Sequence, residues 1–429
     1  MYQARTGLAS QNWRGAAHFN RFIRPWFQRV RVFGLWESCA KNNMAVNCIG
    51  LDGGTGSAVE LRFGQAIEGV DPLVTTPGGL AWLAPGFIDI QVNGFAGVDY
   101  NQPATPPEEI GRSIRALFAT GVTRCFPTVI TGGPQEMAGS LRNLAEARES
   151  LREGAAMEGF HVEGPFISPE DGPRGAHPRR WVRRPDLNEY RRWQEAARGL
   201  VKLVTVSPEW PEAPKFIEAL VSEGVVAAIG HTGAGARQMG EAVRAGATLS
   251  THLGNGAHSR LARHPNYIWE QLAEDRLAAS FIVDGIHLAP SFLKVALRAK
   301  GLERAILITD AVMPAGCAPG PYMLGEVEVE LHADQSVRLR GGTRLAGSAL
   351  RMDRGVENLM KIAGLSLAQA LTMATRNPAR VGRIPNRQRG LAPGERGDVV
   401  QLRFDPATKN IRVEKTWISG REVYGASGE

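Results

Sequence analysis

Short apolar runs alternate with longer amphipathic stretches over most of this 429-residue chain. Each of eight runs has four to six residues, the usual length of a buried strand. Between them, apolar residues recur with the spacing of one helix face. The eight runs are Phe87–Val92, Arg124–Val129, Gly159–Val162, Val201–Val206, Val225–Ile229, Ala247–Ser250, Ala279–Val283 and Ala305–Ile308. Helices are predicted over Glu108–Ala119, Gln135–Leu151, Lys215–Glu223, Ala236–Ala245 and Pro290–Ala299.

This alternation predicts an α/β fold. Eight strand–helix repeats fit a parallel (β/α)8 TIM-like barrel, which typically needs about 250 residues plus insertions. The alternative is an open, doubly wound sheet. The barrel is favoured because the glycine-rich turn that an open sheet places between its first strand and the next helix is missing here.

The two ends of the chain have a different pattern. Residues 44–83 contain short strand-like pieces separated by glycine-rich turns, and residues 387–429 contain more of them. We expect these two segments to pair into one small β-sandwich domain, with the barrel formed by residues 84–386. The stretch 320–345 is typical of a β-hairpin, inserted after the eighth strand.

Residues 1–43 differ from the rest in charge. They hold seven basic residues and one acid, Glu37, whereas the net charge of the whole chain is +7. Arginines alternate with aromatic residues over 21–36, a pattern that suits an anionic membrane surface or a nucleic-acid strand, although Pro25 interrupts any helix there. We favour a disordered, solvated tail, or upstream sequence before a start at Met44, and expect no nucleic-acid or membrane partner.

Composition excludes several classes of protein. No apolar run approaches the roughly 18 residues that span a bilayer, and the 43% hydrophobic content excludes fibrous and disordered classes. The four cysteines, Cys39, Cys48, Cys125 and Cys317, have no close metal-type spacing. A soluble protein of the reducing cytoplasm is therefore expected.

Polar residues follow most of the predicted strands. In a barrel, the carboxyl ends of the strands converge on one rim, where enzymes of this architecture hold their active sites. One such residue alone can cap a helix or form part of the framework. The set comprises Gln91 and Asn93, Thr128, Glu163, His231, His252, Asp284 and His287, and Asp310.

Three of these residues form a metal-type set. Glu163, His231 and His252 supply one carboxylate and two imidazoles from three different strands, a combination that binds a divalent metal and leaves a position for water. Such a metal brings the pKa of its water toward neutrality, and Asp310 could accept the proton. His177, in a polar loop, is either a surface histidine or a group that polarises a substrate carbonyl.

With these residues in place, the chain resembles the amidohydrolase superfamily and, within it, the N-acetylglucosamine-6-phosphate deacetylase family. The resemblance covers about residues 44–424. Each segment is weak alone, but their order and spacing are specific. The segments are APGFIDIQVNG (84–94), FPTVIT (126–131), GFHVEGPFIS (159–168), GAHP (175–178), IGHTGA (229–234), THLGN (251–255), VDGIHL (283–288), LITDAVMPAG (307–316), LAGSAL (345–350) and ATRNPA (374–379).

The resemblance implies a role for each site residue. It implies that Glu163, His231 and His252 bind the metal, and that Asp310 is the catalytic acid and base. His177 would polarise the carbonyl. The substrate-binding residues would be His287, which contacts the sugar, Asn255 and Gly256 at the phosphate, and Arg263, which reaches the phosphate across a homodimer interface.

Two departures from the family pattern stand out. Many superfamily members have two histidines after the first strand and bind two metals, whereas Gln91 and Asn93 stand here as a remnant of that second site. Amides are poorer ligands than imidazole, so one metal is expected. In HLGNGAHSRLARHPN (252–266), Gly256 and Ala257 replace the family's Ala-Met, which leaves the sugar and the phosphate contacts less defined.

The expected function is hydrolysis of the N-acetyl amide of N-acetylglucosamine-6-phosphate, a step of amino-sugar catabolism. The first alternative is the same reaction on N-acetylgalactosamine-6-phosphate or another acetamido sugar. The second is a non-catalytic binding protein that acts through residues 1–43. The donor set suits Zn²⁺ best, with Fe²⁺, Co²⁺ and Mn²⁺ as alternatives.

Overall fold

The structure is a computed structural model that describes residues 45–325 and 327–426. Eight parallel strands form one sheet in the order β14-β13-β12-β11-β10-β9-β8-β5. Their bounds are β5 (Phe87–Val92), β8 (Val122–Ile130), β9 (Phe160–Glu163), β10 (Val201–Val206), β11 (Val226–Ile229), β12 (Leu249–Ser250), β13 (Ala278–Ile282) and β14 (Ala305–Ile308). All eight predicted strands are confirmed. The predictions for residues 1–43 and the start at Met44 lie outside the described residues.

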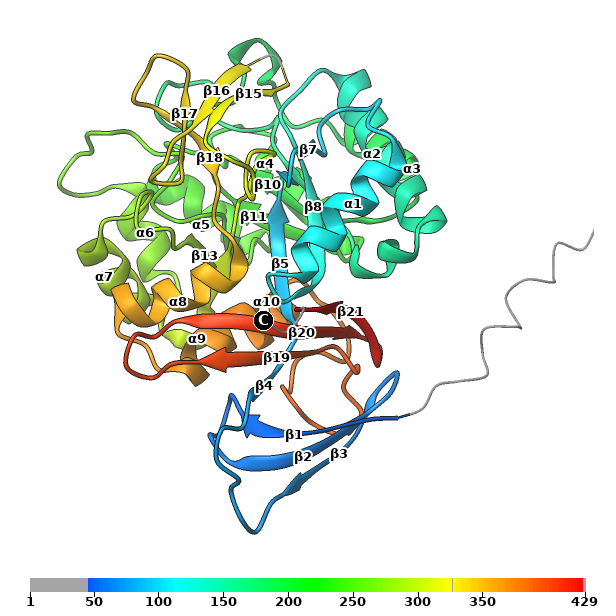
Figure 1. The fold of residues 1–429 in the computed structure, drawn as a ribbon. Coiled ribbons are helices and arrows are strands. Elements are labelled where there is room, and N and C mark those ends of the chain that lie inside the picture. Colours follow the sequence, from blue (N-terminus) through cyan, green and yellow to red (C-terminus); the bar gives the residue numbers. More distant parts are fainter. Residues whose placement is uncertain (1–44, 326, 427–429) are drawn as a thin grey trace, which may run out of the picture. The chain divides into compact units, whose positions relative to one another are not determined.

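The sheet closes on itself between its first and last strands. Val92 and Ala311 form a parallel bridge, and the amide of Asp310 donates to the carbonyl of Gln91 at 3.0 Å. The amide of Asn93 donates to the carbonyl of Ala311 at 2.7 Å. This closure confirms the barrel and excludes the open sheet (Figure 1).

Helices follow most of the barrel strands and surround the barrel (Figure 1). The five predicted helices are confirmed, with ends that differ by a few residues. The α-helices are α1 (Pro107–Phe118), α2 (Pro134–Ser150), α3 (Leu187–Ala196), α4 (Ala213–Ser222), α5 (Ala236–Arg244), α6 (Tyr267–Ala273), α7 (Pro290–Lys300), α8 (Met352–Ala363), α9 (Leu367–Ala374) and α10 (Arg376–Val381). Short 3₁₀ turns span Arg152–Ala156, Arg179–Trp181 and Leu302–Arg304. Among the described residues, no helix combines the length and the apolar character needed to cross a membrane.

An apolar cluster fills the interior of the barrel. Seven of the eight strands contribute side chains to it, as a cluster inside a closed sheet requires. In the strands β5, β11 and β14, these residues recur with the two-residue period of one strand face. The strand side chains are Ile88, Ile90, Phe126, Leu203, Val226, Ala228, Leu249, Ala278, Ile282, Ile306 and Ile308. The remaining strand, β9, carries His161 and Glu163 instead. It therefore places polar side chains beside the apolar interior.

The two ends of the described chain form one β domain, as predicted. Its seven strands join one hydrogen-bonded sheet in the order β21-β20-β19-β4-β1-β2-β3. An edge-to-face contact between Phe63 and Trp417, with ring centroids 5.6 Å apart, joins the two ends in its core. The strands are β1 (Val46–Asp52), β2 (Ala58–Phe63), β3 (Ile67–Pro72), β4 (Trp82–Pro85), β19 (Val399–Phe404), β20 (Ile411–Ile418) and β21 (Arg421–Gly425).

Buried charges join this domain to the barrel. Asp398, the residue before β19, accepts hydrogen bonds from Arg124 of β8 at 2.7 Å and from Arg387 at 2.5 Å. Burial opposes the charge of Asp398, but Arg387 and Arg124 together lower the pKa of its carboxyl. The base of the barrel is therefore held by ionic pairs rather than by apolar contacts alone.

The stretch predicted as a β-hairpin forms four strands rather than two. They make one antiparallel sheet of β15 (Gly320–Leu324), β16 (Val327–Leu331), β17 (Ser336–Leu339) and β18 (Leu345–Ser348). The strand β17 pairs with β16, which would otherwise leave one edge without hydrogen bonds, and β18 pairs with β17. Ser348 then bridges to Ala311, so β18 returns to the rim of the barrel beside Asp310. A two-stranded ribbon, β6 (Gly94–Phe95) and β7 (Val98–Asp99), follows β5.

Candidate metal centre and active site

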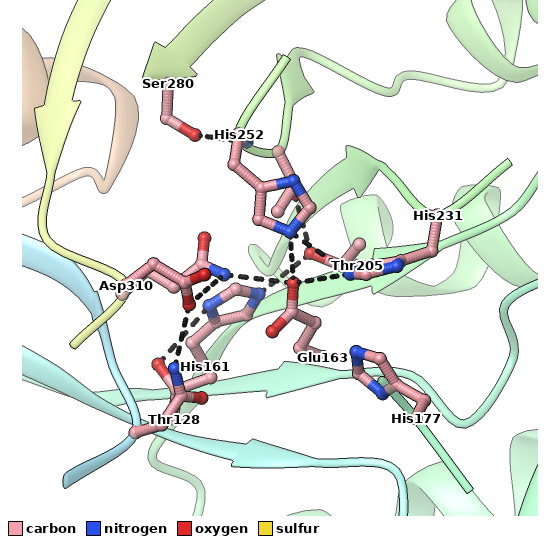
Figure 2. A network of polar contacts seen from close by, with 12 residues as sticks. Thr128, His161, Glu163, His177, Thr205, His231, His252, Ser280 and Asp310 are labelled. Carbon is pink, nitrogen blue, oxygen red and sulfur yellow. Dashed lines mark hydrogen bonds and ion pairs between the residues drawn. The ribbon is translucent and has the colours of Figure 1, made fainter. Parts of the chain in front are cut away.

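Glu163, His231 and His252 meet at the carboxyl end of the barrel (Figure 2). Glu163 ends β9, and each histidine follows its strand, β11 or β12, by two residues. Their candidate ligand atoms all lie within 4.8 Å of one another, and all three side chains are buried. Glu163 Oε1 is 3.1 Å from His231 Nε2 and 2.8 Å from His252 Nε2.

The backbone turns sharply where the site residues lie. His231, His252 and Asp310 have positive φ values of 49°, 30° and 49°. Residues with a β-carbon rarely adopt this left-handed conformation, and it persists only where surrounding structure enforces it. At His252 the amide donates to Ser280 Oγ at 2.8 Å, which helps to hold the turn.

The hydrogen bonds of the two imidazoles fit a cation. His231 Nδ1 lies 2.8 Å from the carbonyl of Pro173, which can only accept, so Nδ1 donates to it and Nε2 is the ring atom that faces Glu163. The Nε2 atoms of His231 and His252 are 3.1 Å apart and face the same carboxylate. Burial acts to raise the pKa of Glu163, but the two histidines together lower it well below its usual range. An anion between two ring nitrogens is the environment that a divalent metal requires.

Asp310 lies beside this trio and shares partners with it. Gln91 Nε2 donates to Glu163 Oε1 at 2.9 Å and to Asp310 Oδ1 at 3.1 Å. Asn93 Nδ2 donates to the same Oδ1 at 2.8 Å. Burial and the charge of Glu163 raise the pKa of Asp310. The side-chain amides of Gln91 and Asn93 therefore act as hydrogen-bond donors that orient the two carboxylates. Asp310 is placed to exchange a proton.

His177 lies across the trio from Asp310, on the other side of Glu163 (Figure 2). The loop after β9 carries it, and its ring centroid is 4.4 Å from that of His231. Its Nδ1 lies 2.8 Å from Thr131 Oγ1. Burial lowers the pKa of His177 to about 3, so the ring is neutral at physiological pH. If the Thr131 hydroxyl donates to Nδ1, then Nε2 carries the ring proton and can donate to a substrate oxygen.

A hydrogen-bonded chain supports the trio from inside the barrel. His161, two residues before Glu163 on β9, has its Nε2 2.8 Å from Thr205 Oγ1, and Thr205 contacts Thr251 Oγ1 at 2.8 Å (Figure 2). Thr251 directly precedes His252 in the sequence. Burial lowers the pKa of His161 to about 4. This hydrogen-bonded chain was not predicted from the sequence, although the two-residue spacing from Glu163 places His161 on the inner face of β9.

A cavity of about 1150 Å³ opens over the site. Its lining includes the three candidate metal ligands and the other predicted site residues His177, Asn255, Gly256, His287 and Asp310. His287 Nδ1 lies 2.5 Å from Asp284 Oδ2, so Asp284 sets the orientation of the ring. Within the described part of the chain, the buried Asn255 Nδ2 has no hydrogen-bond partner. It remains available to a ligand.

Gly256 packs directly against His231. Its φ is +56°, and a β-carbon at this position would lie 2.6 Å from His231 Nδ1. A side chain there would require strained backbone and a shift of the imidazole. The replacement of the family's alanine by glycine therefore matches the local backbone of this chain.

Arg263 does not join the other predicted residues. Its side chain is exposed, and it is not among the residues that line the cavity of its own chain. Two other arginines do line the cavity: Arg260, three residues earlier in the same loop, and Arg344, in the loop between β17 and β18. Neither arginine was predicted from the sequence, because an arginine in an exposed loop shows no periodicity that would assign it to a site.

Comparisons with known proteins show what the chain is similar to. The model of the Amidohydrolase family matches residues 82–423. The chain is 35% identical over 356 residues to N-acetylglucosamine-6-phosphate deacetylase from Bos taurus, covering 80% of this chain and 83% of that protein. It is 30% identical over 356 residues to N-acetylgalactosamine-6-phosphate deacetylase from Escherichia coli O157:H7, covering 83% and 91% of the two chains.

A solved structure matches as well. It contains a mutant of N-acetyl-D-glucosamine-6-phosphate deacetylase from Mycobacterium smegmatis, in complex with N-acetyl-D-glucosamine-6-phosphate. The TM-score is 0.79 at 30% identity, and the match covers 89% of this chain and 99% of that chain. The overall fold is thus a feature that the chain shares with this solved structure.

Proposed function

The chain belongs to the amidohydrolase family, and we propose that it hydrolyses the N-acetyl amide of N-acetylglucosamine-6-phosphate to glucosamine-6-phosphate and acetate. One observation carries this proposal. A carboxylate and two imidazoles converge within 4.8 Å at the barrel rim, with Asp310 and His177 on opposite sides of Glu163. This arrangement provides a proton carrier and an electrophilic donor around one reacting carbonyl.

Glu163, His231 and His252 would hold one divalent metal, and we propose Zn²⁺, which suits this donor set. When bound, such an ion lowers the pKa of a water molecule and polarises a carbonyl oxygen. Fe²⁺, Co²⁺ and Mn²⁺ are the alternatives. Gln91 and Asn93 support the choice of one metal because both already donate hydrogen bonds to carboxylate oxygens.

Asp310 would carry the proton through the reaction. Both of its amide donors bind Oδ1, which leaves Oδ2 without a hydrogen bond within the described residues. Oδ2 would take a proton from the attacking water and return it to the departing nitrogen. His177, neutral and held by Thr131, would donate to the carbonyl oxygen as negative charge develops there.

The remaining contacts would select the substrate. His287 would bind the sugar hydroxyls, while Asn255 and the backbone at Gly256 would approach the phosphate. Arg263, which does not line its own cavity, would act from the partner subunit of a homodimer. A cytoplasmic location is also proposed, and it agrees with the free cysteines Cys48, Cys125 and Cys317.

Release of acetate is the decisive measurement. The full chain, loaded in turn with Zn²⁺, Fe²⁺, Co²⁺ or Mn²⁺, is assayed on N-acetylglucosamine-6-phosphate, and its metal content is measured. Turnover with about one metal per chain supports the proposal. Absence of acetate with every metal, from a folded and loaded protein, would overturn it.

N-acetylgalactosamine-6-phosphate is the second candidate substrate. The 30% identity to the Escherichia coli deacetylase of that sugar phosphate favours it. The same assay with both epimers, and with the unphosphorylated sugars, gives kcat/KM for each. The larger kcat/KM identifies the substrate.

Membership of the amidohydrolase family favours an enzyme over the alternative of a non-catalytic binding protein.

A further inference from the structure

Two arginines that the sequence did not predict contribute to the cavity wall. Arg260 and Arg344 both line it, whereas Arg263 does not. Arg260 belongs to the same loop as Asn255, whose buried amide nitrogen has no partner in the described part of the chain. A donor-rich wall of this kind suits an anionic group on a ligand.

Arg344 is connected to the reaction centre by one short strand. Leu345, Ala346 and Gly347 of β18 all line the cavity, and Ser348 bridges to Ala311 beside Asp310. Four residues of extended chain span about 13 Å. The strand thus follows the cavity wall from the rim of the barrel to Arg344. Arg344 therefore lies one short strand away from the residue next to Asp310, within the same cavity.

Arg344 also differs from its neighbours in how its charge is balanced. Arg338 pairs with Asp334 at 3.4 Å, and Arg340 pairs with Glu328 at 3.1 Å. No ion pair or side-chain hydrogen bond of Arg344 is present among residues 45–325 and 327–426. The arginine of this sheet that faces the cavity is therefore available to an anion.

We propose that Arg344 is a specificity residue that binds the phosphate of the substrate from within the same chain, with Arg260 as a second cationic contact. This inference rests on the proposed function, and it adds the inserted sheet to the substrate site. A guanidinium binds phosphate oxygens in a bidentate manner, which lysine does not reproduce. The insertion would then select phosphorylated over free sugars.

Kinetics on paired substrates test the inference. Arg344→Ala, Arg344→Lys and Arg260→Ala are compared with Arg340→Ala, the matched control from the same sheet. We expect Arg344→Ala to raise KM for N-acetylglucosamine-6-phosphate about 10- to 100-fold, with kcat within about threefold. Arg344→Lys should restore only part of the affinity, while kcat/KM for free N-acetylglucosamine should stay unchanged. Equal KM values for Arg344→Ala and Arg340→Ala, or equal losses on both sugars, would overturn the inference.

A binding measurement separates this inference from the proposed function. Glucosamine-6-phosphate and glucosamine are titrated into the same variants by calorimetry. Weaker binding of the phosphorylated sugar alone to Arg344→Ala supports the phosphate contact even if the wild type releases no acetate. Unchanged binding of both ligands overturns it even if the wild type is an active deacetylase.

Discussion

The rim of the barrel and the loops across the cavity hold their polar groups in opposite ways. At the rim, Glu163, His231 and His252 are buried and face one another within 4.8 Å. Across the cavity, Arg260 and Arg344 are exposed and have no partners among the described residues. Strand ends are fixed by the closed sheet, so they can hold a reaction centre rigidly. Loops and insertions are free to vary, so they are suited to choosing the substrate.

Among substitutions at the rim, Asp310→Asn should cause the largest loss of activity. The amide retains the shape but cannot carry the proton, so kcat should fall about 10³- to 10⁴-fold. Metal content, measured by mass spectrometry, should stay near that of the wild type because Asp310 is not in the trio. Asp334→Asn, an exposed aspartate of the inserted sheet, is the control and should remain active. A kcat near the wild-type value would remove the proton-carrier role.

His177→Ala should lower kcat somewhat less than Asp310→Asn does. Loss of one donor to a developing oxyanion typically lowers kcat about 10²- to 10³-fold. Because the pKa of His177 is about 3, the ring does not titrate between pH 5 and 9, and the variant should retain the shape of the wild-type pH profile. The measurement is kcat over that pH range. A variant with altered pH limits would show that His177 is a proton carrier instead.

Gly256→Ala tests the contact between the loop residue Gly256 and His231 at the rim. The added methyl would lie 2.6 Å from His231 Nδ1, at a residue with φ +56°. We expect a loss of about 10- to 100-fold in activity, together with lower metal content, because the imidazole must move. Gly199→Ala, also at positive φ but with no atom near its added carbon, controls for backbone strain alone. Equal effects of the two substitutions would contradict a role for contact with His231.

Asp284→Asn should have the smallest effect. Asp284 Oδ1 accepts from the amides of Ile286 and His287, and Oδ2 accepts from the His287 ring. An asparagine can keep the amide contacts but would present NH₂ to Nδ1, which moves the ring proton to Nε2. We expect KM to rise about 3- to 10-fold with kcat nearly unchanged. A fall in kcat with constant KM would place His287 in the chemistry rather than in sugar binding.

Much of the rim was predictable from sequence because strands have a local signature. A run of four to six apolar residues marks a strand, and the first polar residues after it mark the rim. That rule selected Glu163, His231, His252 and Asp310. It did not select His161, because a histidine within an apolar run looks like a core residue. Only its contact with Thr205, 44 positions away, identifies it as support for the site.

The loops were less predictable because their sequences lack the hydrophobic periodicity that shows which way a side chain points in a strand or helix. Arg263 was chosen by resemblance, yet Arg260 and Arg344 line the cavity. The hairpin over 320–345 became a four-stranded sheet, since the pairing of β17 and β18 depends on a free edge rather than on a strong strand pattern.

By itself, then, the order of residues determined the number of barrel strands, the β domain at the chain ends and the identity of the polar residues after most of the strands. These features follow from short-range periodicity. Only the tertiary structure decided that two imidazole nitrogens lie 3.1 Å apart, that the site residues turn through positive φ, and that Arg344 reaches the cavity. Those features depend on closure of the barrel, which brings together residues more than 200 positions apart, such as Gln91 and Asp310.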